Sequence, residues 1–295
     1  MAAGWLQYIA GGLTAGAIYA LVALGFSIVF NASRAINFAQ GEFVMIGGMS
    51  AVSFVGLGLP MIVAVPLAVA AAALAGLIVQ WVALERLERE AGGGEVVTLI
   101  IITIGVSLFL RGAAQVFWDK RIHPLPAFSG NTPIAIGDAT VLPQGLWVLG
   151  GTAVAVIALA WFFERTLSGK AMRATASNVL AARLVGISTR GVMRASFALA
   201  AALGALGGVL TAPITFTSYD VGVMLGLKGF AAAMLGGLGS FGGAVAGGLL
   251  LGLIEGLGAG FVSSAYKDAI AFVVILAVLF VMPGGLFGAR TSERV

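Results

Sequence analysis

Residues 8–30 read YIAGGLTAGAIYALVALGFSIVF, an apolar run without a single charged side chain. A helix needs about 20 mostly apolar residues to cross the hydrocarbon core of a bilayer. The run therefore predicts a membrane-spanning helix over Tyr8–Phe30. Residues 1–7 contain no Lys or Arg, so the basic region of a cleavable signal is missing, and we expect this first span to be retained.

The composition of the whole chain agrees with a membrane location. Of the 295 residues, 60% are hydrophobic and 9% are charged, whereas soluble domains carry about 25% charged residues. This excludes a soluble enzyme and a disordered chain. The 16 basic residues are too scattered to follow a phosphate backbone, so we expect no nucleic-acid partner. The chain has no cysteine and one histidine, which excludes thiolate and His-rich metal sites.

Charged and polar segments divide the rest of the chain into further apolar stretches of spanning length. The glycine-rich stretch Gly226–Gly260 is too long for one helix and short for two, so it predicts either one span with a re-entrant half-helix or two short spans. The expected fold is an all-α transmembrane bundle of eight or nine spans, forming a single domain over residues 1–295. The other predicted spans are Glu42–Leu59, Pro60–Leu84, Val96–Trp118, Gly145–Phe163, Ala195–Ala212 and Asp268–Met282.

The distribution of basic residues predicts the orientation of the bundle. Six of the 16 lie in the segment Glu164–Arg194, which places that segment in the cytoplasm. Counting spans puts the charged linker Glu85–Glu95 on the same side and the proline-rich loop Asp119–Gln144, with His123 solvated in it, outside. The N-terminus is then external. Arg290 and Arg294 favour an internal C-terminus, which requires the glycine-rich stretch to cross twice.

The 44 glycines recur within the predicted spans. Pairs four residues apart, such as Gly12 and Gly16, place small residues on one helix face, where they allow backbones to approach closely. Tight helix packing is the simple interpretation of these pairs, and a direct role in transport is the alternative. Two glycine-interrupted segments, Asn37–Ser50 and Gly229–Ser240, predict broken helices that border a pathway through the bundle.

Few ionisable residues fall inside the spans, where charges are costly and are by default functional. Glu42 follows Gly41 at a predicted helix start, so it either stabilises that start or lines a pathway. Asn37 and Gln40 precede it and can satisfy freed backbone groups. We expect Arg111 to extend to the outer interface and Arg34 to be interfacial. If the glycine-rich stretch forms two spans, Glu255 should approach an interface, as an ordinary polar residue does.

Several mechanisms are excluded by what the sequence lacks. No chain of acidic residues threads the spans, as a proton- or sodium-driven transporter would usually need. The phosphate-binding pattern GxxxxGK[ST] is absent, and residues 168–171 (SGKA) do not complete it. We therefore expect no cofactor on this chain, no metal and no ATPase activity of its own.

The segment Glu164–Arg194 reads ERTLSGKAMRATASNVLAARLVGISTRGVMR. Its apolar residues recur at helical spacing, which predicts a short amphipathic helix that starts at Ser168-Gly169 and ends at Gly186. Such a helix across the inner face would offer a docking element to a cytoplasmic partner. The alternative is a plain basic connector.

Four motifs resemble known permeases. Ala181-Ala182-x-x-x-Gly186 resembles the EAA loop, the coupling helix of bacterial ABC importers, with Leu180 at the usual Glu and without the downstream Ile-x-Leu-Pro. Ile36–Glu42 (INFAQGE) resembles the I-N-F-A-H-G-E run of LivH-type branched-chain amino acid permeases, with Gln40 in place of a common His. Residues 169–174 and 229–237 match the same family, and the resemblance covers essentially the whole chain.

This resemblance implies a permease subunit of an ATP-driven ABC importer that moves branched-chain amino acids across the inner membrane. It implies a LivM-like second permease, two LivG/LivF-like ATPase subunits that hold ATP and Mg²⁺, and a periplasmic substrate-binding protein, all working beside membrane lipid. The pathway should be mostly apolar, and backbone groups at the break near Asn37–Glu42 should meet the polar ends of the amino acid. The residues expected in these roles are Tyr19, Asn37, Gln40 and Glu42 for the pathway and Gly169, Arg173, Asn178, Ala181, Ala182 and Gly186 for ATPase coupling.

Three alternatives remain at the level of the sequence. Related permeases carry urea, amides or other amino acids. A self-sufficient channel or facilitator would transport without ATP. A purely structural subunit would leave the pathway to its partner.

Overall fold

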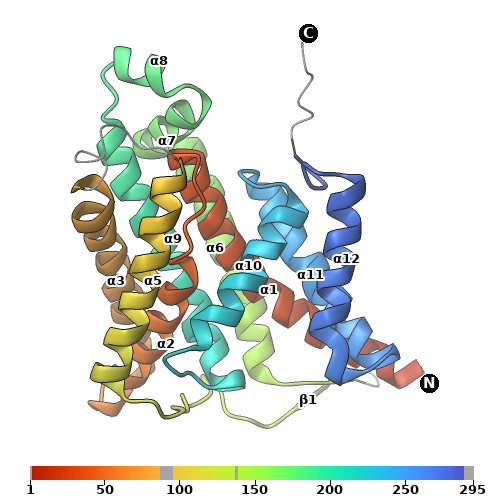
Figure 1. The fold of residues 1–295 in the computed structure, drawn as a ribbon. Helices are drawn as coiled ribbons and strands as arrows, with labels where there is room; N and C mark the ends of the chain where they lie inside the picture. Colours follow the sequence, from red (N-terminus) through yellow and green to blue (C-terminus); the bar gives the residue numbers. More distant parts are fainter. Residues whose placement is uncertain (1, 87–95, 137–138, 289–295) are drawn as a thin grey trace.

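A computed structural model describes residues 2–86, 96–136 and 139–288, and it is a helical bundle with one small hairpin (Figure 1). Seven helices are long and apolar enough to cross a membrane, which confirms the predicted all-α membrane architecture. They are α1 (Ala2–Ser33), α3 (Met61–Ile78) continued by the π-helical turn η1 (Val79–Leu84), α5 (Val96–Trp118), α6 (Pro143–Arg165), α9 (Thr189–Thr215), α11 (Phe241–Phe261) and α12 (Lys267–Val281) preceded by η2 (Ser264–Tyr266).

Two shorter helices complete the bundle. The helix α2 (Gln40–Gly56) has 17 residues and α10 (Val221–Gly236) has 16, so each is about 25 Å long, against about 30 Å for the hydrocarbon core. The glycine-rich stretch thus forms two helices, α10 and α11, joined by a turn over residues 237–240. The count of long and short helices agrees with the predicted eight or nine spans.

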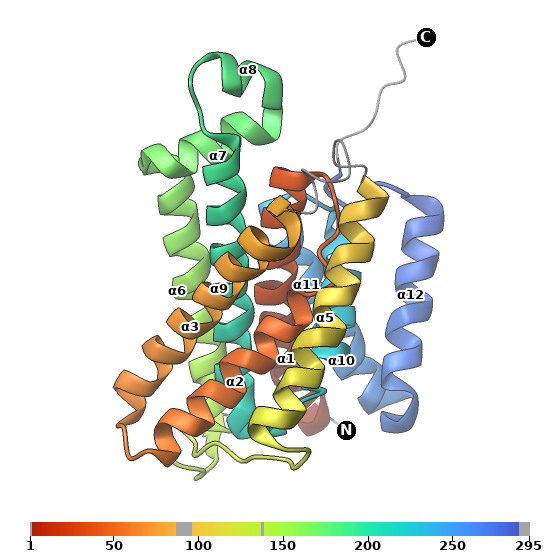
Figure 2. The ribbon, with the colours of Figure 1, turned by 60° about the vertical axis from the view of Figure 1, so that its left-hand side comes forward.

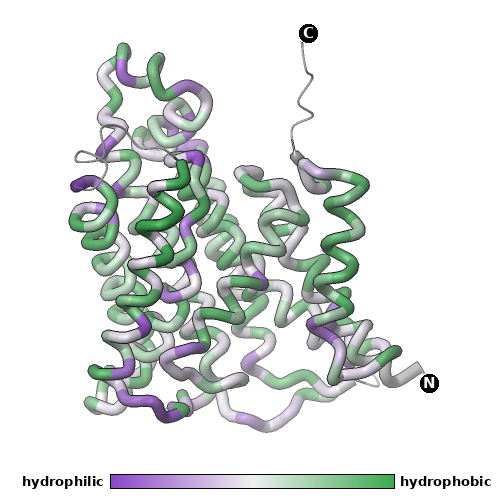
Figure 3. Tube along the Cα trace, viewed as in Figure 1, coloured by the Kyte–Doolittle hydropathy of each residue, from purple (hydrophilic) through white to green (hydrophobic). Residues whose placement is uncertain are grey.

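The two ends of the bundle carry the segments that the charge distribution assigns to opposite sides. The short helices α7 (Leu167–Ser177) and α8 (Val179–Leu184) lie at the same end as the last turn of α12, whereas the first turns of α1 and the hairpin of β1 (Ile134–Ile136) and β2 (Ala139–Val141) lie at the other end (Figures 1 and 2). Most of the predicted cytoplasmic linker Glu85–Glu95 lies outside the described residues. Hydrophobic residues cover the helices between the two ends (Figure 3).

Glycine contacts hold α1 against α11. A Cβ added to Gly12 would lie 2.7 Å from the carbonyl oxygen of Gly252, and one added to Gly16 would lie 2.9 Å from that of Gly248. These distances leave no room for a side chain on either helix. The predicted glycine stripes are therefore packing surfaces.

The chain breaks between α1 and α2, as predicted for the first glycine-interrupted segment. After Ser33 the backbone takes a positive φ of 58° at Arg34, turns back into the bundle, and starts α2 at Gln40 (Figure 1). The Asn37 side chain accepts a hydrogen bond from the backbone N–H of Ala39 (3.1 Å), which stabilises the turn before the helix. Next to it, Gly41 touches the backbone of Gly222 on α10.

The segment after α12 closes onto α10. The N–H groups of Leu286 and Phe287 donate to the carbonyl oxygens of Leu235 and Gly236 at 2.9 and 3.0 Å. These carbonyls belong to the last turn of α10, whose acceptors have no partner within the helix. The tail residues therefore cap α10 and tie α12 to it.

The predicted single helix between Ser168 and Gly186 is wrong in one respect, because the structure has two helices. The chain breaks at Asn178, where φ is −154°, and the Asn178 side chain accepts a hydrogen bond from the N–H of Ala181 (3.0 Å) as the N-cap of α8. Gly186, with φ of 84°, ends α8, and the N–H of Ile187 bonds back to the carbonyl of Ala182 (3.0 Å). An N-cap asparagine within the apolar periodicity was the signal for the break.

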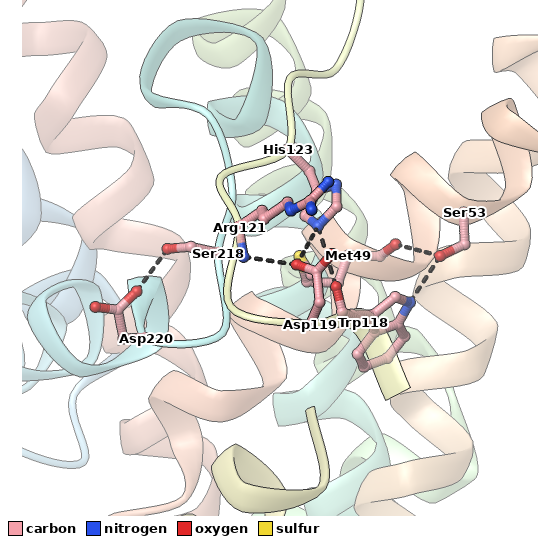
Figure 4. Close-up of polar contacts among 8 residues, drawn as sticks. All are labelled: Met49, Ser53, Trp118, Asp119, Arg121, His123, Ser218 and Asp220. Carbon is pink, nitrogen blue, oxygen red and sulfur yellow. Dashed lines mark hydrogen bonds and ion pairs between the residues drawn. The ribbon is translucent and has the colours of Figure 1, made fainter. Parts of the chain in front are cut away.

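At the opposite end, His123 joins two loops instead of being only solvated. Its backbone pairs with Thr217 through two hydrogen bonds of 2.8 and 3.0 Å. Its ring lies 3.2 Å from Asp119, which also accepts the backbone N–H of Arg121, and that N–H lowers the pKa of Asp119 below its usual value (Figure 4). Beside it, the Trp118 indole donates to Ser53 at 2.7 Å and ties α5 to α2.

Candidate functional site

A buried ion pair joins α2 to α5. One oxygen of the Glu42 carboxylate accepts hydrogen bonds from Ser107 (2.8 Å) and from the guanidinium of Arg111 (2.9 Å), and Glu42 is 1% exposed. The expectation that Arg111 extends to the outer interface is therefore wrong, because an acidic partner in the bundle holds it. The carboxylate binds α5 instead of capping its own helix start.

A cavity of about 260 Å³ lies next to this pair, between α1, α2, α5 and α10. Its polar wall consists of Glu42, Ser107 and Arg111. The other side chains on its walls are all apolar, and three of them are aromatic. They are Phe26, Phe38, Ile104, Leu108, Val223, Leu227 and Phe230.

The other predicted pathway residues lie deeper in the bundle. Gln40 is completely buried, donates to the carbonyl of Ala200 (2.9 Å), and fits against Gly25 and Gly204. Asn37 is buried in the turn before α2. Gln40 holds the broken segment against α1 and α9, whereas Asn37 stabilises the turn itself. Of the four predicted pathway residues, Glu42 is the one that lines this cavity.

Tyr19 belongs to a second buried polar cluster. Its hydroxyl donates to Glu255 (2.5 Å) and accepts from Lys228 (3.1 Å). The Lys228 ammonium also pairs with Glu255 at 2.6 Å and with Asp268 at 2.8 Å, which joins α1, α10, α11 and α12. Glu255 is 5% exposed and paired inside the bundle, so it is not an ordinary polar residue, although its stretch forms two helices. Burial of an acidic residue needs a paired cation, and here Lys228 supplies it.

Sequence reasoning missed Lys228, Ser107 and Asp268 as parts of these clusters. Lys228 stands alone in an apolar stretch, and that isolation was a usable signal, because an intramembrane lysine needs a partner. The partners lie on other helices, so their identity depends on how the helices pack. Ser107 lies four residues before Arg111, a spacing that places both side chains on one face of α5.

The predicted coupling residues gather on α7 and α8. Gly169 is buried against the backbone of Phe162, with no space for a side chain. Ala182 is the buried residue of α8. Arg173, Asn178 and Ala181 are exposed. This unit projects from the end of the bundle (Figures 1 and 2). Three apolar residues on and directly after α8 are exposed, namely Leu180, Leu184 and Val185, and Leu184 is 89% exposed.

Among the described residues, no group of three or more His, Cys, Asp or Glu side chains is placed to hold a metal ion.

Comparisons with known proteins agree on one family. Residues 8–279 match the family described as branched-chain amino acid transport system / permease component. The chain is 34% identical to the permease LivH of Escherichia coli over 99% of its own length and 98% of that protein. It is equally similar, at 34%, to the permease BraD of Pseudomonas aeruginosa, with the same coverage of 99% and 98%. Both relatives are named as high-affinity branched-chain amino acid transport system permease proteins.

A solved structure shows the same fold. PsaBC from Streptococcus pneumoniae, in complex with Fab, aligns with a TM-score of 0.51 over 97% of this chain and 98% of that one, at 15% sequence identity. The match supports the fold alone.

Proposed function

The chain belongs to the branched-chain amino acid permease family of ABC transporters, as a multi-pass protein of the inner membrane, and from that premise we propose that it carries branched-chain amino acids inward in an ATP-driven importer. The family consists of transport components that work with other permease, ATPase and binding-protein subunits. The specific partners proposed are a LivM-like permease, two LivG/LivF-like ATPase subunits and a periplasmic binding protein.

The observation that carries the ATP-driven mechanism is the α7–α8 unit. It projects from the end of the bundle that the basic residues assign to the cytoplasm, and it exposes Leu180, Leu184 and Val185. Exposed apolar side chains on a water-facing helix mark a protein-binding surface. We propose that an ATPase subunit covers α8 and that its closure on ATP moves α6 and α9, which flank the unit in sequence.

The internal geometry supports transmission of that motion. Gly169 lies directly on the backbone at the end of α6, so α7 cannot shift without pushing α6. Arg34, in the turn that leads to α2, donates to the carbonyl of Ala176 on α7. A displacement of α7 therefore reaches the broken segment in front of Glu42, which is the requirement for coupling to a pathway there.

Tyr19, Asn37, Gln40 and Glu42 remain the proposed pathway residues. Glu42 already lines a cavity. The other three are buried in this conformation and would face the pathway only after the helices packed around them move apart. Alternating access requires such a change, because the pathway must open to each side in turn.

The docking proposal is tested with a single introduced cysteine, since the chain has none of its own. A cysteine at exposed Ala181 should crosslink to a cysteine on an ATPase subunit in the assembled transporter. A cysteine at Ile122, which is exposed at the opposite end of the bundle, is the matched control. Absence of crosslinks from Ala181, or equal crosslinking from Ile122, contradicts the proposal.

The substrate is tested in proteoliposomes that contain the assembled transporter and its binding protein. Uptake of leucine, isoleucine and valine should require ATP, and urea and acetamide should neither be taken up nor compete. Uptake of urea or acetamide instead would place the chain with the amide permeases. Leucine flux through this chain alone, without ATP, would identify a facilitator.

A further inference from the structure

The Glu42–Arg111 pair occupies one wall of an otherwise apolar cavity. The pair brings an anion and a cation to the same wall, within 2.9 Å of each other. The same cavity is lined by Phe26, Phe38 and Phe230, and the ring of Phe230 lies 5.6 Å from that of Phe26 and 6.1 Å from that of Phe38. A volume of about 260 Å³ lies near the lower end of the range for small-molecule sites.

The ion pair has hydrogen-bonding capacity that the described residues do not use. The second carboxylate oxygen of Glu42 and the Nε–H of Arg111 are buried and have no hydrogen-bond partner. Buried polar groups of a finished core are almost always paired, so an orphaned acceptor and an orphaned donor on two residues that line one cavity require an explanation. The Glu42 oxygen is an acceptor that suits an ammonium group, and the Arg111 Nε–H is a donor that suits a carboxylate.

Resting on the proposed function, we propose that this cavity is the binding site for an α-amino acid zwitterion within the membrane. Arg111 receives the α-carboxylate, Glu42 receives the α-ammonium, Ser107 holds the Glu42 carboxylate in place, and the three phenylalanines contact the branched side chain. A zwitterion fits because its charges match both members of the pair and leave the site neutral. A lone cation or anion would leave one member of a buried pair without its counter-charge, which is costly.

The walls also account for selection of an apolar side chain. No charged side chain lines the cavity besides Glu42 and Arg111. A charged substrate side chain would therefore be buried without a partner, whereas leucine would gain contact with the aromatic rings. The cavity is reached between α5 and α10, where Leu108 and Leu227 are both exposed.

The competing explanation is that the pair only ties α2 to α5. Loss of a structural tie would lower stability and leave ligand contact at the cavity unchanged. The test must therefore report occupancy directly, without relying on transport.

Protection of an introduced cysteine provides that readout. In the assembled transporter, a thiol reagent should label cysteines at Leu108 and at Phe109, neighbours on α5 that are both exposed. Leu108 lines the cavity and Phe109 does not. L-leucine should slow labelling of Leu108→Cys and leave Phe109→Cys unaffected. Val223→Cys and Met224→Cys on α10 form a second matched pair, because Val223 lines the cavity and Met224 does not.

Two leucine analogues and two variants of the chain test the contributions of the Glu42 and Arg111 charges separately. We use 4-methylpentanoate, which lacks the ammonium, and 3-methylbutylamine, which lacks the carboxylate, and both should protect at least about tenfold less well than leucine, because each loses one charge-assisted hydrogen bond. Glu42→Gln should raise the leucine concentration for half protection by a similar factor and should not weaken protection by 4-methylpentanoate, which has no ammonium group to meet Glu42. Arg111→Gln should do the converse, sparing 3-methylbutylamine.

The outcomes distinguish the site from the function. Unslowed labelling of Leu108→Cys while ATP-driven leucine uptake continues overturns the site and leaves the proposed function standing. Protection by leucine without any leucine uptake supports the site and overturns the function. Protection by both analogues as strong as that by leucine, or unchanged leucine protection in Glu42→Gln and Arg111→Gln, shows that the pair is only a tie between helices. An unchanged thermal unfolding temperature verifies that each variant is folded.

Discussion

The ammonium of Lys228 on α10 lies 2.6 Å from a carboxylate oxygen of Glu255 on α11, in the interior of the bundle. Tyr19 and Asp268 complete the cluster from α1 and α12. The cluster contains two carboxylates and one ammonium, and four helices depend on its single cation. Its integrity should therefore govern how the C-terminal helices pack.

Replacement of that cation should destabilise the bundle. Lys228→Met leaves two carboxylates near one another without compensation, and breaking a buried pair in this way costs about 3–5 kcal/mol. We expect a marked fall in the thermal unfolding temperature of the purified transporter. Lys120→Met, at an exposed loop position, is the control and should leave it unchanged. Equal stability of the two variants would show that Lys228 contributes little.

Neighbouring glycines on α1 should differ sharply in their tolerance of a side chain. A Cβ at Gly12 meets the backbone of α11, whereas one at Gly11 meets nothing within 4 Å. Gly12→Val should lower the amount of folded transporter in the membrane, since overpacking costs about 1–3 kcal/mol or more. Gly11→Val should accumulate normally, as measured by immunoblot and thermal melting. Similar levels for both variants would contradict backbone contact between α1 and α11.

The cap of α8 should matter for coupling more than for folding. Asn178→Ala removes the side-chain acceptor for the Ala181 N–H and costs about 1 kcal/mol locally. Substrate-stimulated ATPase activity should fall several-fold while the thermal unfolding temperature changes little. Asn178→Asp retains the cap and should preserve activity. Ser177→Ala is the neighbouring control, because Ser177 bonds only to its own helix, and loss of coupling there would argue against the cap.

A charge on the exposed tip of α8 should prevent docking of the ATPase. Leu184 is 89% exposed on α8, and Leu167 is similarly exposed at the start of α7. Leu184→Glu should reduce co-purification of the ATPase subunits, because burial of an unpaired carboxylate is unfavourable. Leu167→Glu, nearer to the bundle, should reduce it less. Undiminished co-purification of Leu184→Glu would remove α8 from the interface.

The sequence alone predicted those elements that are specified by residues close together in the chain. The span Val96–Trp118 coincides with α5, because an apolar run bounded by charges specifies a membrane helix without reference to its neighbours. Residues close together in the chain also predicted the glycine stripes and the break before α2. They likewise predicted that segments 164–194 and 119–144 lie at opposite ends. Asn178 was named as a coupling residue, but its effect as a helix start was overlooked within a continuous apolar pattern.

The site depended on information that the sequence does not carry locally. Arg111 lies 69 positions from Glu42, and Lys228 lies 209 positions from Tyr19. Whether an isolated charge extends to an interface or meets a partner depends on the rotation of its helix, which is set by packing. For this reason Glu42 was identified and its partner was not.

Leu286 and Phe287, which follow α12, cap the far end of α10, and Asp268 holds the middle of that helix from the start of α12. With two attachments apart from each other, α12 can neither swing nor slide without carrying α10 along. The helix α10 also meets α2 through Gly41, Gly222 and Gly226, where the two backbones approach too closely to admit a side chain. We therefore expect the C-terminal helices α10 and α12 to move together along this backbone contact with α2 when the pathway opens.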